Sequence, residues 1–450
     1  MRELGIGLRR VLRGRVLVQG DEEFEAISRP WDAAVDQRVV AVVEAADAAD
    51  VSALVRYARQ AGLAVATQPN GHAPSAGFEG TILLRTRLMN SVEVRPGERI
   101  ARVGPAATWG DVLAEAGKHE LVALAGSTAV VSATAFTLGG GVSWFGRKYG
   151  FAANSVRSFD VVDADGAQLT VTRESDPELF WALRGGGGDF AIVTAMEFDL
   201  HPGNGLYGGR ILWPATRAAA VMAAFREVTA QAPDGLSVWF TLLQFPPFPE
   251  LPEPLRGLSA VAIDVASLDG EGHDLLRAFE AIPGVIFDTR GPLAAADLGA
   301  IAAEPTDPTD AFVHSELLTD LDDAAAAALL MSAGPGTVAP LVSVQVRHLG
   351  GALSVVREDA GAAGHIAEPY MLSMVGVLFT PEMEGPVRAR QEVIASALAF
   401  RTSGRKPFTF LSHDETAAHA FPASTLARLR DIKRRRDPAG VFRSNHPVLG

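Results

Sequence analysis

Apolar and polar positions in the first part of the chain alternate between the spacing of helices and that of short strands. Over residues 47–61 the apolar positions recur at helical spacing, Asp47 or Asp50 can cap the start, and Gly62 suits the end. Residues 63–67 are apolar and predict a strand directly after this helix. The pattern therefore predicts a helix followed by a buried strand, and a loop at the end of that strand.

Three further segments before residue 205 carry clear local signals. TWGDVLAEAG (108–117) predicts a helix with a capping box formed by Thr108 and Asp111. FDVVDADGAQLTVT (159–172) has two alternating runs around the Asp165-Gly166 dipeptide, which predicts a β-hairpin. DPELFWAL (176–183) predicts a short helix, and the strand AIVTAMEFDLHP (191–202) ends this region.

From about residue 206 the segments become longer. Strand-like runs alternate with alanine-rich helical ones, and this arrangement predicts an α+β lobe in which helices back one sheet. The predicted strands are LSVWFTLL (236–243), SAVAIDVA (259–266), LVSVQVRHL (341–349) and YMLSMVGVLF (370–379), and the predicted helices include 215–230 and 322–333. A last helix within 422–436 is ended by Asp437-Pro438.

Length and composition fit a two-lobed globular protein. The chain has 450 residues, 48% hydrophobic and 21% charged, which is too long for one ordinary core. The net charge of −13 argues against a nucleic-acid surface, and the basic run 433–436 is too short to change that conclusion. Because the chain has no cysteine, disulfides, thiolate nucleophiles, cysteine-ligated metals and cysteinyl cofactor links are excluded. No other metal site is expected.

The N-terminal residues do not resemble a secretion signal. Arg9, Arg10 and Arg13 interrupt each apolar run there, and no stretch of the chain reaches the roughly 18 apolar residues that a membrane span needs. These observations predict a soluble, cytoplasmic protein that has no membrane partner.

Two glycine runs and one histidine-containing loop are the strongest chemical signals. The runs are LGGGVSWFG (138–146) and RGGGGDF (184–190), and the loop is QPNGHAPSAG (68–77). Glycine clusters let the backbone approach a phosphate or a flat ring closely. Trp144 and Phe190 stand where a G-x-G-x-x-G motif needs its last glycine, and no P-loop motif is present. A Rossmann dehydrogenase and a nucleotide triphosphatase are therefore not supported.

The order of these segments resembles the FAD-linked oxidases of the vanillyl-alcohol oxidase superfamily, and most closely their berberine-bridge-enzyme-like branch. The resemblance rests on the loop with His72, on the block 126–202 and on LRDIKRRRDPAGVFRSN (429–445). It implies an α+β fold with a two-lobed FAD-binding domain at 1–205, a sheet-and-helix substrate domain at 206–405, and a C-terminal segment, 406–450, that returns to the FAD-binding domain.

The resemblance also implies which residues bind FAD. His72 would bond covalently to the 8α-methyl carbon of the flavin, in a loop whose backbone cradles the pyrophosphate. The implied FAD contacts are Pro69, Asn70, Gly71, His72, Ala73, Gly126, Ser127, Thr128, Thr134, Gly139, Gly140, Gly141, Gly188, Ile192 and Val193. Thr128 stands where bicovalent members have a second flavin-linking cysteine, so that second link cannot form.

Some residues depart from the pattern of the family. Pro69 and Asn70 replace glycines of the pyrophosphate loop. Proline has no backbone N–H and Asn70 restricts the turn, so we expect one or two donors to the phosphates to be lost. Residues 407–410 (PFTF) replace the family's frequent Tyr-x-Asn-Phe beside the flavin. Covalent attachment through His72 requires a neutral imidazole, and hence a pKa near or below about 6.5. The alternative is that FAD is held non-covalently and His72 packs against the edge of the flavin.

The catalytic base is the least determined feature. Candidates on strands of the substrate domain are His348, Glu316 and Tyr370, together with His314.

The activity that the resemblance implies is that of an oxidase. Such an enzyme transfers a hydride from a small organic substrate of secondary metabolism to flavin N5, and oxygen is the electron acceptor. A dehydrogenase of the same fold and a paralogue without redox turnover are the alternatives. The sequence does not determine the oligomeric state.

Overall fold

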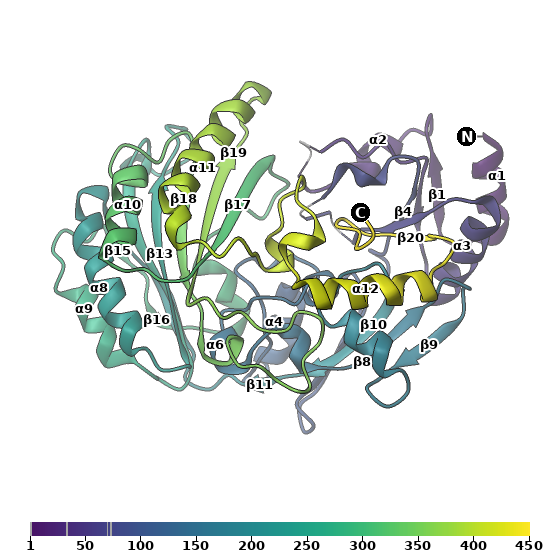
Figure 1. Cartoon of the computed structure of the whole chain (residues 1–450), viewed down its shortest axis with the longest axis horizontal. Coiled ribbons are helices and arrows are strands. Elements are labelled where there is room, and N and C mark those ends of the chain that lie inside the picture. The colour runs from purple at the N-terminus through teal and green to yellow at the C-terminus, as the bar shows by residue number, and fades with distance from the viewer. Residues whose placement is uncertain (1, 33–34, 70, 73) are drawn as a thin grey trace.

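The computed structural model describes residues 2–32, 35–69, 71–72 and 74–450, and it has two lobes side by side (Figure 1). One lobe holds both chain termini and two five-stranded sheets, and the other holds one eight-stranded sheet backed by helices. The α+β, two-lobed fold predicted from the sequence is therefore confirmed.

The first sheet of the terminal lobe mixes parallel and antiparallel strands in the order β1-β2-β4-β3-β20. Its strands are β1 (Arg15–Val18), β2 (Ala41–Glu44), β3 (Val65–Thr67), β4 (Ile82–Arg85) and β20 (Phe442–Arg443). The accompanying helices are α1 (Arg2–Val11), α2 (Phe24–Ser28) and α3 (Ala48–Ala61). Because β20 pairs with β3 in parallel, the C-terminal residues complete a sheet that the N-terminal residues begin.

The second sheet is antiparallel, in the order β5-β6-β10-β8-β9. Its strands are β5 (Val92–Arg95), β6 (Ile100–Val103), β8 (Val156–Val162), β9 (Gln168–Val171) and β10 (Ile192–Asp199). The other elements of this lobe are α4 (Trp109–Gly117), β7 (Leu121–Val122), α5 (Ala133–Leu138), α6 (Gly146–Tyr149), α7 (Pro177–Leu183), β11 (His201–Pro202) and α12 (Ala423–Arg436). The largest hydrophobic core lies here and extends from α4 to α12.

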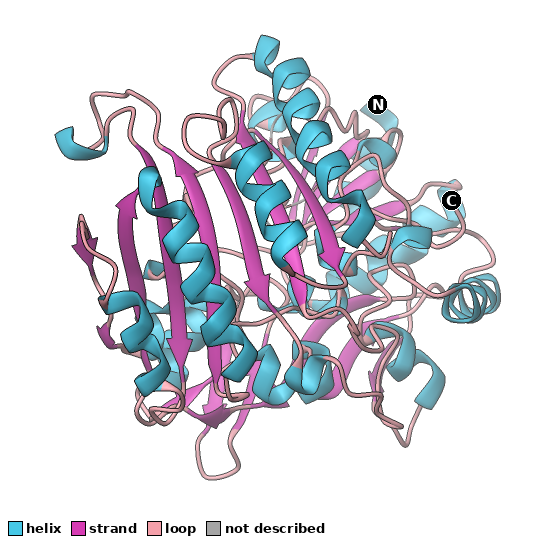
Figure 2. Ribbon diagram, turned by 60° about the vertical axis from the view of Figure 1, so that its left-hand side comes forward, coloured by secondary structure: helices cyan, strands magenta, loops and turns pink. Residues whose placement is uncertain are grey.

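The other lobe is built on a sheet with the order β15-β12-β14-β13-β18-β19-β17, in which β16 also pairs with β12. Its strands are β12 (Tyr207–Pro214), β13 (Leu236–Gln244), β14 (Ser259–Ser267), β15 (Phe287–Asp288), β16 (Gly291–Pro292), β17 (Ala311–Leu318), β18 (Ser343–His348) and β19 (Tyr370–Val377). The helices are α8 (Ala218–Gln231), α9 (Arg277–Glu280), α10 (Asp323–Ala333) and α11 (Glu384–Leu398). Figure 2 shows α8, α10 and α11 lying across one face of the sheet.

The predicted helix caps and the hairpin are present. Asp47 caps α3 by accepting from the backbone N–H groups of Ala49 and Asp50, and Gly62 ends the helix in the left-handed conformation (φ 66°). Thr108 and Asp111 form the capping box of α4. The strands β8 and β9 pair across the predicted turn at 163–166.

The two faces of the eight-stranded sheet have different surroundings. Val344 and Val346 of β18 belong to the core beneath the helices, so the alternating residues Gln345 and Arg347 lie on the opposite face. Trp239 is the cross-strand partner of Arg347 and lies on this same face. Its ring stacks on Trp144 of the terminal lobe with centroids 3.5 Å apart, so this face packs against the terminal lobe. We call this side, which meets the terminal lobe, the inner face.

The C-terminal return is held by a buried lysine. Lys433 Nζ donates to the backbone carbonyl of Asp189 (2.7 Å), to the carbonyl of Phe442 (2.9 Å) and to the carboxylate of Asp437 (2.7 Å). Asp189 belongs to the second glycine run, so this contact ties α12 to that run.

Within the described residues, no helix combines the length and the apolar character needed to cross a membrane.

Candidate cofactor and substrate site

The two glycine runs meet the C-terminal segment 407–410. A Cβ on Gly139 would lie 2.5 Å from Thr409 Cγ2, and one on Gly187 would lie 2.9 Å from Phe408 Cζ. Side chains at these two positions would therefore push the C-terminal segment away. By contrast, the space around Gly188 is open, with no atom of the described residues within 4 Å of a Cβ built there. The structure thus brings together three segments that the sequence resemblance assigns to the flavin.

The histidine loop is a tight turn against the N-terminal segment. Gly71 has a left-handed conformation (φ 81°), its carbonyl accepts from Trp31 N–H (3.1 Å), and a Cβ there would lie 2.8 Å from Pro30 Cα. The ring of His72 stacks on Trp31 with centroids 4.1 Å apart. The predicted contacts Asn70 and Ala73 lie outside the described residues.

His72 is neutral at pH 7. Burial lowers its pKa from 6.5 to about 4, because the protonated imidazole would lose its hydration. Its Nδ1 atom is buried and has no hydrogen-bond partner among the described residues. A neutral ring with an unpartnered nitrogen is the state that the predicted bond to the flavin needs.

Other buried polar atoms near these segments also lack partners among the described residues. The side chain of Gln68, which precedes Pro69, accepts from Arg85, but its Nε2 has no acceptor among them. The hydroxyls of Thr134, Thr137 and Thr409 are likewise unpaired in the described part of the chain. Buried polar groups without partners are costly, so these atoms suit a ligand that is rich in hydrogen-bonding groups. The residues present therefore fit FAD.

The remaining predicted FAD contacts lie in or beside the core. Ser127 is buried, and a Cβ on Gly126 would lie 3.0 Å from the ring of Phe136. Ile192 and Val193 are buried in β10, where they pair with residues of β8. Gly141 has a positive φ of 78°, and a Cβ there would lie 2.5 Å from the ring of Phe136. Three predicted contacts remain. Thr128 is partly exposed, Gly140 donates its N–H to the carbonyl of Thr137 (2.9 Å), and Pro69 lies in a bend directly after Gln68.

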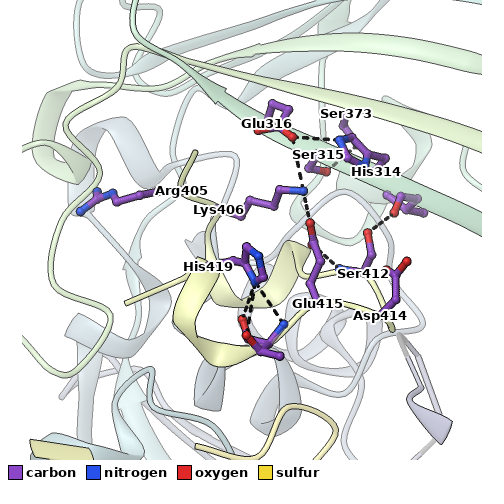
Figure 3. Close-up of polar contacts among 12 residues, drawn as sticks. His314, Ser315, Glu316, Ser373, Arg405, Lys406, Ser412, Asp414, Glu415 and His419 are labelled. Carbon is purple, nitrogen blue, oxygen red and sulfur yellow. Dashed lines mark hydrogen bonds and ion pairs between the residues drawn. The ribbon is translucent and has the colours of Figure 1, made fainter. Parts of the chain in front are cut away.

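Glu316 belongs to a charged cluster between β17 and the C-terminal segment. Its Oε1 atom lies 2.9 Å from His314 Nε2 and 3.4 Å from Lys406 Nζ, and Lys406 also donates to Glu415 (Figure 3). Burial by itself would raise the pKa of Glu316, but the hydrogen bond from His314 and the charge of Lys406 outweigh it, so the pKa lies below its ordinary value. Glu316 is therefore ionised at pH 7.

This cluster borders the first glycine run. Lys406 lines a cavity of about 20 Å³ together with Gly139, Leu317, His365 and Phe408. That volume accommodates about one water molecule. The ionised carboxylate of Glu316 is thus connected, through Lys406, to the segment where the glycine run and residues 407–410 meet.

His348 and Tyr370 lie on the helix-covered face of the sheet. His348 Nε2 is 3.0 Å from a guanidinium nitrogen of Arg147, and Tyr370 Oη is 2.9 Å from the hydroxyl of Thr229 in α8. Burial and the positive charge of Arg147 lower the pKa of His348 to about 3. The structure therefore places these two candidates together, directly opposite each other on β18 and β19, but apart from the inner face.

The inner face carries a row of hydrogen-bonded polar side chains that the sequence analysis does not single out. Arg210 pairs with Asp264 through contacts of 2.5 and 3.0 Å, and the hydroxyl of Thr241 donates to Asp264 (3.1 Å). Gln345 Nε2 donates to Thr241 (3.1 Å), and Arg347 Nε donates to Gln345 Oε1 (2.5 Å). The sequence does carry a signal for this row of polar side chains, because single polar residues stand at alternate positions of otherwise apolar strands.

Comparisons with known proteins agree with this geometry. Residues 39–172 match the family model described as an FAD binding domain. The chain is 28% identical over 97% of its length to (R)-6-hydroxynicotine oxidase of Paenarthrobacter nicotinovorans, of which it covers 97%. It resembles the crystal structure of 6-hydroxy-D-nicotine oxidase from Arthrobacter nicotinovorans (TM-score 0.82, 23% identity, 96% and 97% of the two chains covered). It also resembles the Physcomitrella patens BBE-like 1 protein (TM-score 0.83, 18% identity, 99% and 98% covered).

Proposed function

Because the chain is an FAD-dependent oxidoreductase of the vanillyl-alcohol oxidase superfamily, with berberine-bridge-enzyme-like relatives, we propose that it acts as an oxidase on a small organic substrate of secondary metabolism. Bound FAD would accept a hydride from the substrate at N5 and pass the electrons to oxygen, which yields hydrogen peroxide. The protein supplies a tether for the cofactor, a proton acceptor and a surface that orients the substrate.

The observation that carries the proposal is the state of His72. It is neutral, it stacks on Trp31, and it presents a buried nitrogen without a partner in the described residues. We assign this nitrogen as the group that bonds to the flavin. The unpaired hydroxyls of Thr134 and Thr137 supply hydrogen bonds to the same cofactor.

Proton removal is assigned to Glu316. It is ionised at pH 7, and its partner Lys406 lines the cavity beside Gly139. Glu316→Gln should lower kcat by about 10²- to 10⁴-fold, the usual contribution of a general base, with the flavin spectrum unchanged. Glu415→Gln is the matched control, because it removes the other carboxylate beside Lys406 and should lower kcat far less. Equal losses in both variants would contradict the assignment.

The activity itself is tested on the purified protein. An absorption spectrum should show bound flavin, and flavin reduced without oxygen should be reoxidised rapidly by air with release of peroxide. (R)-6-Hydroxynicotine is one substrate to try, because of the oxidase relative described above. Slow reoxidation by air but rapid reoxidation by a dye would indicate a dehydrogenase. A colourless protein that cannot be reconstituted with FAD would refute the proposal.

A further inference from the structure

The two arginines of the inner face differ in how their charge is compensated. Arg210 makes two short contacts with Asp264. Arg347 donates to the neutral amide of Gln345, and its nearest carboxylate oxygen, on Glu304, lies 3.8 Å from Nη2, which is too far for a hydrogen bond. The terminal nitrogens of Arg347 therefore make no hydrogen bond within the part of the chain that the structure describes. The Arg347 side chain is only 9% exposed.

A buried guanidinium whose terminal nitrogens make no hydrogen bond to an anion is costly, so its retention calls for a partner. Two aromatic rings lie beside the group, because its carbon lies 4.0 Å from the ring centroid of Trp239 and 5.3 Å from that of Phe410. These ring contacts leave the N–H groups of the terminal nitrogens without an acceptor in the described residues. Two parallel N–H groups in one plane match the two oxygens of a carboxylate.

A carboxylate bound to Arg347 would lie near the proposed flavin site. Phe410 belongs to the same turn as Phe408 and Thr409, which contact the two glycine runs. Glu304 comes from the loop that precedes β17, and its side chain is 34% exposed. It can therefore move into solvent when another anion takes its place beside Arg347.

We propose that Arg347 binds a carboxylate of the substrate, and that this carboxylate displaces Glu304. The inference rests on the proposed function, since it identifies the class of substrate for the same site. Gln345 and Thr241 are positioning residues, because their hydrogen bonds fix the guanidinium in its plane.

The test measures binding without turnover, on the purified FAD-loaded chain, by isothermal titration calorimetry. The probes are two matched pairs, acetate with acetamide and benzoate with benzamide, in which only the charge of the ligand changes. Wild type should prefer the carboxylate in at least one pair by about 10- to 100-fold, as expected for charge-assisted hydrogen bonds. Arg347→Gln should abolish this preference, and Arg347→Lys should retain part of it because the charge remains.

Glu304→Gln gives a second, independent readout. Removing the competing carboxylate should tighten carboxylate binding, whereas a site for cationic substrates would lose affinity for a cationic probe such as benzylamine. Arg388→Gln is the control, because Arg388 also stacks on an aromatic ring, that of Phe312, but contacts Glu384 and His413 away from the inner face. It should keep the wild-type preference.

Three results would overturn the inference: no preference for carboxylate in either pair of wild type, an unchanged preference in a folded Arg347→Gln protein, or weaker carboxylate binding by Glu304→Gln. Thermal unfolding and the flavin spectrum show whether Arg347→Gln is folded, and if it is not, the lysine and Glu304 variants decide. A carboxylate preference in a protein that fails to react with oxygen would refute the oxidase proposal alone.

Discussion

The buried histidine of β18 makes the stability of the fold depend on pH. His348 is 7% exposed, and burial together with the charge of Arg147 holds its pKa at about 3. In the unfolded chain a histidine has a pKa of about 6.5. Between these values the unfolded chain binds a proton that the folded protein does not. Stability from this residue is therefore complete above pH 6.5 and falls as the pH falls towards 3.

The size of the effect follows from the two pKa values. At pH 5 the unfolded state gains about 2 kcal/mol from protonating this one side chain, and the folded state gains almost nothing. In His348→Gln an amide oxygen can still accept from Arg147, and there is nothing to titrate. The loss of unfolding free energy between pH 7.5 and pH 5 should therefore be about 2 kcal/mol smaller in the variant than in wild type.

Urea unfolding at the two pH values, followed by circular dichroism, measures this difference. His119→Gln is the control, because His119 is exposed and solvent reaches its ring in both states. Equal pH-dependent losses in wild type and His348→Gln would refute the reasoning. The same variant also tests the catalytic role predicted for this histidine. A structural residue should leave the folded protein active at pH 7.5, whereas a general base would cost about 10²-fold or more in kcat.

Three other changes test the site and its support. His72→Ala should abolish flavin colour that stays with acid-precipitated protein, and colour retained there would show that another residue forms the link. Gly139→Ala should weaken FAD binding because its Cβ would lie 2.5 Å from Thr409 Cγ2, and Thr409→Ser should restore binding in the double variant; an equally weak double variant would contradict this. Lys433→Met should lower the unfolding free energy by about 3–5 kcal/mol, because it leaves the carboxylate of Asp437 buried without a cation, and chemical denaturation measures this loss.

Local sequence signals predicted several of the elements, and one helix that they missed shows a physical reason for the failure. The helix α3, the capping box of α4 and the β8–β9 hairpin each depend on contacts between residues close in sequence. The helix α11 was not predicted, because its buried stripe includes the polar Gln391. That side chain donates to the backbone carbonyls of Phe312 and Met374, which are distant in sequence. A polar residue on a buried face hides a helical pattern unless its partners are known.

For the site, the resemblance to a known family implied the class of cofactor, and the sequence supplied the segments on which that resemblance rests. These segments are the loop with His72, the block 126–202 and residues 429–445, and the lack of cysteine by itself excludes a cysteinyl link. Only tertiary packing brings the two glycine runs into contact with residues 407–410, and only tertiary packing pairs Glu316 with Lys406.

The inner face of the eight-stranded sheet shows most clearly what a sequence pattern leaves undecided. Alternation along β18 implies that Gln345 and Arg347 share one face of the strand and His348 the other. It cannot tell which face meets the terminal lobe, because both faces of this sheet are buried and both carry polar residues. The stacking of Trp239 on Trp144 settles that choice, and only the three-dimensional structure contains it.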